Sequence, residues 1–511
     1  MTAMAWWSRG KRANRPVAAP TRNLLVISDI HLGEDILIDG PELLNSYIRV
    51  LNGTLMGFLR GHQNAPEDGR PWHLIINGDM FDFVKMPLSQ QDAVGLRPGS
   101  EQEALRKLDR IMRIHRPLFV AMTSFLLAGN FITIVEGNHD AEFFFDGVRG
   151  ALRQEIVRLA GSQLRRQGLP LSHSHEVGER LTFSSWFVAE MGHYHIEHGH
   201  QYDSFCSFEH KLAPLEAPLE AAAEAVLTQP MSHRILPQVA ELLGNFSTHG
   251  INDMKLTELL RLLRRLGLKN SWKLAVAYGA LCALLLRQAG SRRRQGLRQM
   301  AVHQARRLRV LCAESCYSAG VLRALDKLKA PPAEYNLTTM LHLFWVDRLL
   351  VLGAGASVAL TWLTFFNASW LQASMVMAFA GLCTVALSSV NPTPLRSVLR
   401  DAAAHIAQVT GAQYVIFGHS HQPECVNLYE AYGVGRSSQQ PRYINGGSWV
   451  TREILRGDAS EGMTFVKITA RGAELLRWRG PDVAPICLQE TGASEHSHPS
   501  PATRTPGQAT G

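Results

Sequence analysis

The chain of 511 residues lacks the cysteine pattern of a disulfide framework or a zinc knot. Its seven cysteines are an odd number, are scattered from Cys206 to Cys487 and include no Cys-x-x-Cys pair. This pattern predicts reduced thiols in a protein that faces the cytosol. The opening segment also lacks the apolar core of a secretion signal and carries a basic cluster instead, so we interpret residues 1–21 as a basic leader.

Charge is absent from one long stretch near residue 370. No Asp, Glu, Lys or Arg occurs between Arg348 and Arg396. A polar break divides this stretch into residues 349–366 and 370–390, and each half is about as long as a helix that crosses a hydrocarbon core of about 30 Å. We therefore predict a transmembrane hairpin that anchors the protein in the membrane through residues 349–390. A buried hairpin in a soluble protein is the alternative.

Positive charge is concentrated before this hairpin. The formal net charge is +8, and the segment from Asp253 to Lys329 is rich in Lys and Arg. Within it, leucines between Leu256 and Leu266 recur at helical spacing beside arginines, which predicts a basic amphipathic helix. Because arginines flank membrane helices on the cytoplasmic side, we expect both flanks of the hairpin, and the domain that they connect to, to lie in the cytoplasm. The location at a bacterial inner membrane is what the resemblance given below implies.

Apolar runs elsewhere end abruptly in side chains that can bind metals. The runs at residues 24–27, 74–76, 131–135 and 414–417 read as buried strands. Five short motifs share Asp, His or Asn and follow these runs or a further strand-like stretch at 194–196: Ser28-Asp29-Ile30-His31, Gly78-Asp79-Met80-Phe81-Asp82, Gly137-Asn138-His139-Asp140, His198-Gly199-His200 and Gly418-His419-Ser420-His421. Strands that deliver polar side chains to one sheet edge are typical of a functional site.

The strand and helix signals predict an α/β fold that is interrupted once. Strand-like runs, including one at 182–188, alternate with helical stretches such as 101–127. We assign residues 22–203 and 400–480 to one discontinuous domain and residues 204–399 to a mostly helical insertion. We expect the strands after residue 400 to form an antiparallel layer that completes the first sheet, and residues 481–511 to form a disordered tail.

The motif residues suit two divalent ions. Two ions held roughly 3.5–4 Å apart need a shared carboxylate, for which Asp79 is the candidate. The remaining ligands divide into two groups, which are Asp29, His31 and His421 for one ion, and Asn138, His198 and His419 for the other. Oxygen and nitrogen ligands without sulfur favour Mn, Fe or Zn over a structural zinc site.

In their order, the five motifs resemble the five blocks of the calcineurin-like metallophosphoesterases. This resemblance covers residues 22–203 and 400–480, and it implies a four-layer α/β/β/α sandwich with a dinuclear centre. It implies hydrolysis of a phosphoester or pyrophosphate by a hydroxide that bridges the two metals. It also implies that His139 is catalytic and faces the phosphate, that Asp82 orients His139, and that Asp140 and His200 lie just outside the ligand shell.

The chain is also similar to bacterial UDP-2,3-diacylglucosamine hydrolases, which commonly carry Arg where this chain has His139 and lack so large an insertion. A membrane hairpin beside a basic helix favours a phosphoester substrate that is linked to a lipid. Two other functions remain open: a nuclease or cyclic-nucleotide phosphodiesterase, and a membrane-tethered scaffold without catalysis. Aromatic residues are scarce in the basic segment, so we expect no nucleic-acid partner.

Overall fold

A computed structural model describes most of the chain. The described residues are 22–33, 41–216, 225–233, 264, 295–333, 346–366, 369–389, 395–434, 440–450 and 462–488. The predicted basic leader, most of the predicted amphipathic helix and most of the tail lie outside these ranges. The described strands and helices form a mixed α/β fold, which confirms the predicted class.

The first sheet has seven strands in the order β12-β11-β10-β1-β2-β3-β4. Its parallel half consists of β1 (Asn23–Ile27), β2 (Trp72–Asn77), β3 (Phe131–Val135) and β4 (Leu181–Ser184). Its antiparallel half consists of β10 (Thr464–Thr469), β11 (Gly472–Arg477) and β12 (Ile486–Cys487). The pairing of β1 with β10 therefore joins the two ends of the chain in one sheet.

The second sheet has five strands in the order β5-β6-β7-β9-β8. Its three central strands, β6 (Tyr194–Glu197), β7 (Tyr414–Phe417) and β9 (Arg442–Asn445), are parallel. The outer strands, β5 (Phe187–Glu190) and β8 (Glu424–Asn427), pair antiparallel to their neighbours. Pairing of β6 with β7 brings together two parts of the chain that the insertion separates in sequence.

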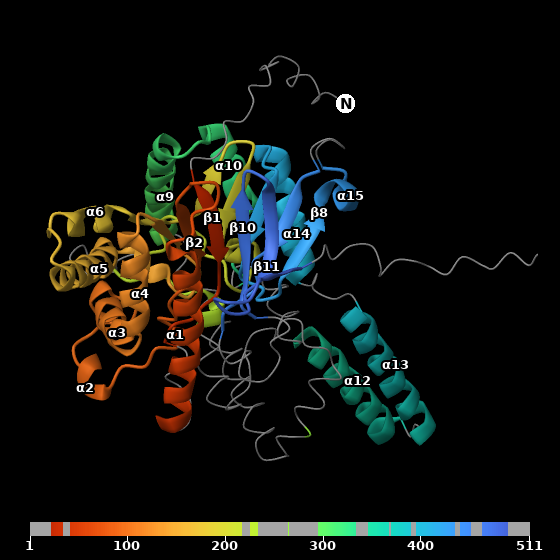
Figure 1. Ribbon diagram of the computed structural model, residues 1–511. Coiled ribbons are helices and arrows are strands. Elements are labelled where there is room, and N and C mark those ends of the chain that lie inside the picture. The colour runs from red at the N-terminus through yellow and green to blue at the C-terminus, as the bar shows by residue number, and fades with distance from the viewer. Residues whose placement is uncertain are drawn as a thin grey trace, which may run out of the picture.

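Helices cover both sheets (Figure 1). Five helices lie on the side of the first sheet: α1 (Pro41–Gln63), α3 (Glu101–Ile114), α4 (Arg116–Leu127), α5 (Asp146–Gln167) and α6 (His173–Glu179). The second sheet packs against α10 (Ala319–Leu328) and α14 (Leu395–Thr410), with α9 (Gln295–Glu314) beside them. Short helical elements are α2 (Gln90–Ala93), η2 (Ala141–Phe144), η3 (His200–Tyr202) and α15 (Leu428–Tyr432).

The alternation of side chains along β1 explains why this strand is apolar throughout. Leu25 and Ile27 lie in the core that includes the helices α1, α4 and α5. Leu24 and Val26 lie in a separate core with Ile416 and other residues of the second sheet. Successive residues of a strand point to opposite faces, so a strand that is buried on both faces reads as a continuous apolar run.

One strand prediction is wrong in detail. The run predicted as one strand at 182–188 is divided between β4 of the first sheet and β5 of the second. The chain changes sheets at Trp186, which is buried and donates its indole N–H to Glu197 Oε2 at 2.6 Å. The predicted helical stretch 101–127 is confirmed as helical and consists of α3 and α4, which meet at His115 just before Pro117 at the start of α4.

The prediction for the C-terminal strands is correct for only half of them. Strands β10 and β11 do extend the first sheet with antiparallel pairing. Strands β7 and β9, however, lie in the second sheet as parallel neighbours. Helix α14 leads directly into β7, and a parallel strand needs such a crossover connection. The sequence analysis also did not anticipate β8.

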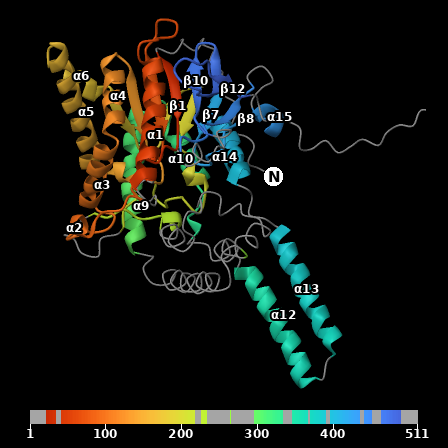
Figure 2. The ribbon, with the colours of Figure 1, turned by 60° about the horizontal axis from the view of Figure 1, so that its bottom comes forward.

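Two helices lie where the hairpin is predicted. They are α12 (Val346–Phe365) and α13 (Trp370–Ser389), which pack against each other and project away from the sheets in both views (Figure 2). Many of their large apolar side chains are exposed, including Phe365, Trp370 and Phe379. Among the residues that the structure describes, no helix is both long enough and apolar enough to cross a membrane.

Candidate metal centre

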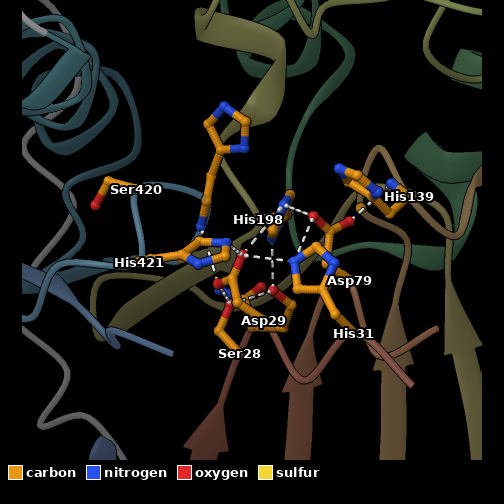
Figure 3. A network of polar contacts seen from close by, with 12 residues as sticks. Ser28, Asp29, His31, Asp79, His139, His198, Ser420 and His421 are labelled. Atoms are coloured by element: carbon orange, nitrogen blue, oxygen red, sulfur yellow. Dashed lines mark hydrogen bonds and ion pairs between the residues drawn. The ribbon is translucent and has the colours of Figure 1, made fainter. Parts of the chain in front are cut away.

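The motif residues follow the carboxyl ends of parallel strands in both sheets. Asp29 follows β1 and Asp79 follows β2, whereas His198 follows β6 and His419 follows β7. The side chains of Asp29, Asp79 and His198 and those of His31 and His421 face one another in a single buried cluster (Figure 3). The site therefore forms where the ends of the two sheets meet, from residues nearly 400 positions apart in the chain.

The backbone at this cluster has an uncommon conformation. Five motif residues have positive φ angles between 52° and 67°: Asp29, His31, Asp79, His419 and His421. Such left-handed conformations cost free energy for residues other than glycine and gather at functional sites. Gly418 is required for a different reason, because a Cβ atom there would overlap Ser28 Oγ and lie 2.6 Å from Asp29 Oδ2.

The first group of predicted ligands is brought together around Asp29. Asp29 Oδ1 lies 3.2 Å from His421 Nε2 and 4.0 Å from His31 Nε2. The other oxygen of Asp29 accepts the backbone N–H of His419 at 3.0 Å and the hydroxyl of Ser28. These contacts hold Oδ1 toward the two imidazoles, and the three side chains have atoms close enough to share one ion.

Of the second predicted group, His198 lies beside Asp79, whereas His419 lies in a separate group with Asp203 and Cys206. Asp79 Oδ2 lies 3.2 Å from His198 Nε2 and 3.7 Å from His31 Nε2. His198 Nδ1 contacts the carbonyl oxygen of Asn77 at 2.9 Å, which directs Nε2 into the cluster. Because Asp79 lies within 4 Å of a histidine from each predicted group, its position fits the predicted bridging role.

Charge and hydrogen bonding in the cluster suit a cation. Asp29 and Asp79 are both buried, and close carboxylates need a positive partner. Burial alone would raise the pKa of Asp29, but the imidazoles of His421 and His198 outweigh burial and lower that pKa to about 2. Among the described residues, buried Asn138 Oδ1 has no hydrogen-bond partner. These ionised carboxylates, imidazoles and a vacant amide oxygen are a donor set for divalent ions.

His139 and Asp82 form a pair at the edge of this cluster. Asp82 Oδ1 lies 3.2 Å from His139 Nδ1, and the His139 backbone N–H donates to Asp79 Oδ1 at 2.8 Å. Burial lowers the pKa of His139, but the charges of Asp82 and Asp79 outweigh burial and raise that pKa above its usual value. The protonated form of this imidazole is thus favoured beside the predicted ligands, as a general acid requires.

The two residues predicted just outside the ligand shell have different environments. Asp140 accepts backbone N–H groups from Gly137 at 2.6 Å and Met80 at 2.8 Å, which ties together the loops after β3 and β2. His200 is fully buried, with its ring centroid 5.4 Å from that of His198. Burial, followed by the charge of Lys211, holds the pKa of His200 well below its usual value.

The structure adds residues that the sequence analysis missed. Asp203 Oδ2 lies 3.2 Å from His419 Nε2, and Cys206 is close enough to complete a third group with them. Asp203 follows His200 by three residues, but an isolated aspartate at that spacing gave no separate signal. His233, within the insertion, has its ring centroid 5.1 Å from that of His139. A single histidine far from the motifs in sequence offered no signal.

A scan against models of protein families finds no family that matches the chain. A search of curated proteins finds no matching protein either.

Proposed function

We propose that the chain is a calcineurin-like metallophosphoesterase that hydrolyses a phosphoester or pyrophosphate bond. One observation carries this proposal: buried Asp and His side chains from the ends of four strands in two sheets converge on one cluster, at Asp29, Asp79, His198 and His421. Helices pack against each sheet, and the two sheets share a core between them. These features support the proposed four-layer α/β/β/α arrangement.

In the proposed site, Asp29, His31 and His421 would hold one ion, Asn138, His198 and His419 would hold the other, and both would use Asp79. When bound, two Mn, Fe or Zn ions supply a hydroxide nucleophile near neutral pH and offset the charge of the phosphoryl oxygens.

His139 holds a proton for the departing oxygen. Asp82 orients its imidazole through the contact between Oδ1 and Nδ1 and favours the protonated form. Asp140 fixes the two loops that carry Asp79 and Asn138 by accepting backbone N–H groups from each. The chain thus contributes ion binding, orientation of the acid and a site with little access to water.

We propose a substrate that is linked to a lipid and presented at a bacterial inner membrane. The exposed apolar side chains of α12 and α13 support this proposal, because large exposed apolar patches mark membrane or protein contacts. The same helices would hold the catalytic domain at the cytoplasmic surface. Equal activity toward membrane-borne and freely soluble esters would contradict the lipid-linked substrate.

The test is hydrolysis of bis(p-nitrophenyl) phosphate by the purified full chain, with Mn²⁺ added or removed by a chelator. We expect turnover that depends on metal and is lost in Asp79→Asn and His139→Ala, but is kept in a control variant of exposed His175, His175→Ala. Metal content is measured in parallel. Absence of turnover in protein that holds two ions, across diesters, monoesters and pyrophosphates, would contradict the enzymatic function and favour a scaffold.

A further inference from the structure

A segment of the insertion lies directly beside the candidate site. Residues 231–233 form a helical turn, and the Ser232 backbone N–H donates to the carbonyl oxygen of Phe205 at 3.1 Å. Phe205 precedes Cys206, which is close enough to His419 and Asp203 to share an ion with them. On the other side of the same turn, the ring of His233 contacts the ring of His139. The turn therefore reaches from the His419 side of the site to the His139 side.

The imidazole of His233 is buried without a partner for one of its nitrogens. The residue is only 7% exposed, and its Nε2 makes no hydrogen bond to any described residue. Burial, followed by the charge of His139, lowers the pKa of His233 to about 3, so that its imidazole is neutral. A buried polar atom without a partner costs free energy unless another group satisfies it.

The position of His233 points to a role other than metal binding. Among the described residues, the groups of Asp, His and Cys that could hold an ion do not include His233. Its ring packs at 53° to that of His139, whose Nδ1 lies 3.2 Å from Asp82 Oδ1. The charged groups that act on the pKa of His233 are the cations His139 and Lys85 and the carboxylates Asp82 and Asp79. Asp82 contacts His139 and Asp79 contacts His198, so the partner that remains for Nε2 is an oxygen of a bound ligand.

We propose that His233 is a substrate-contacting residue whose Nε2 forms a hydrogen bond to an oxygen of the phosphoryl group, beside the leaving oxygen that His139 protonates. This inference rests on the proposed phosphoesterase function. It makes residues 231–233 of the insertion part of the active site and assigns the insertion a role in selecting the phosphoryl substrate. A neutral imidazole can donate this bond without adding a second charge next to protonated His139.

The first measurement is the affinity of the Mn-loaded full chain for inorganic phosphate, by calorimetry, in the wild type, His233→Ala, His233→Gln and the control His175→Ala. A hydrogen bond to a charged group contributes enough that its loss weakens binding by roughly tenfold or more. We expect this loss in His233→Ala, partial recovery in His233→Gln, whose amide keeps a donor, and no change in the control. Manganese content should be equal in all four proteins.

Wild-type phosphate affinity in His233→Ala, with normal manganese content, would overturn the proposal. Loss of manganese from both His233 variants, with folding intact by circular dichroism, would also overturn it, because His233 would then support the metal site. If the wild type binds manganese and phosphate but hydrolyses no ester, the proposed phosphoesterase function is wrong. The phosphate affinity of His233→Ala then still tests the contact with His233. If the manganese-loaded wild type binds no phosphate, both proposals fail.

Discussion

Asp82 Oδ1 lies 3.2 Å from His139 Nδ1, as expected if this carboxylate orients a general acid. The other oxygen of Asp82 lies 3.1 Å from Nδ1 of His31, a predicted metal ligand. Asp82 itself is fully buried, and its pKa is held well below the usual range because the nearby cationic groups, His139 first, outweigh the effect of burial. One carboxylate therefore orients both a predicted acid and a predicted ligand.

This double contact predicts that Asp82 and His139 variants behave differently. In His139→Ala we expect kcat to fall by about 10²–10⁴, the usual contribution of a general acid, with manganese affinity unchanged. In Asp82→Asn we expect a fall in kcat together with manganese binding that is weaker by about 10–100-fold, because His31 loses its orienting partner. Steady-state kinetics and metal titration measure the two effects. Equal metal affinity in both variants would contradict the role of Asp82 at His31.

Asp203, a carboxylate that the sequence analysis did not predict, should support His419 in the second group of predicted ligands. Asp203 Oδ2 lies 3.2 Å from His419 Nε2, which leaves Nδ1 of His419 for an ion. We expect Asp203→Asn to weaken manganese binding by about 10–100-fold, since a carboxylate that holds a ligand histidine strengthens it. Asp109→Asn, at an exposed ion pair, is the matched control. Unchanged metal affinity in Asp203→Asn would show that His419 needs no such support.

The parts of the fold that could be predicted are those with a local signal. The apolar runs of β1, β2, β3 and β7 mark strands because each is buried on both faces. The sheet to which a strand belongs carries no comparable signal. Partners such as β6 and β7 are decided by packing across the whole chain, so the assignment of β7 and β9 to the first sheet failed.

The same difference holds at the site. Asp29, Asp79 and His198 could be predicted because each stands in a short polar motif directly after a strand. Asp203 and His233 could not, because their roles depend on contacts with His419 and His139 that no sequence spacing encodes. The positive φ angles of the predicted ligand residues could not be predicted either, because Asp and His rarely adopt such conformations, whereas glycine often does.

The exposed helices α12 and α13 predict attachment to membranes. Phe366 and Trp370 stand at the turn between them and are 73% and 79% exposed. We expect the full chain to sediment with anionic lipid vesicles, and the double variant Phe366→Asp/Trp370→Asp to bind them at least tenfold less, because charge opposes entry into the bilayer. Val94→Asp changes an equally exposed apolar residue elsewhere and should have no effect. Undiminished sedimentation of the double variant would contradict contact through this turn.

Close approach at Gly418 predicts a severe effect of a single methyl group. A Cβ atom at this position would overlap Ser28 Oγ, so Gly418→Ala must displace Asp29 or the loop after β7. We expect manganese binding to be lost and the free energy of unfolding to fall by about 2–3 kcal/mol, as for overpacked cores. Gly150→Ala is the control: this site lies in helix α5 with open space around it, and the change should stabilise by about 0.5–1 kcal/mol. Thermal unfolding and metal titration measure both.

His73 should make the protein sensitive to acid without involving the metal site. This imidazole on β2 contacts Thr133 Oγ1 at 2.7 Å, and burial, followed by the charge of Arg22, lowers its pKa from 6.5 to about 4. The unfolded chain binds the proton more readily than the native protein, so the free energy of unfolding should fall as the pH drops from 6.5 to about 4, by roughly 3 kcal/mol in total. His73→Gln keeps a polar partner for Thr133 and should reduce this pH dependence. Denaturant unfolding at pH 7, 6, 5 and 4, with EDTA present, measures how the free energy of unfolding changes with pH. The same change in the wild type and in His73→Gln would contradict a neutral buried His73.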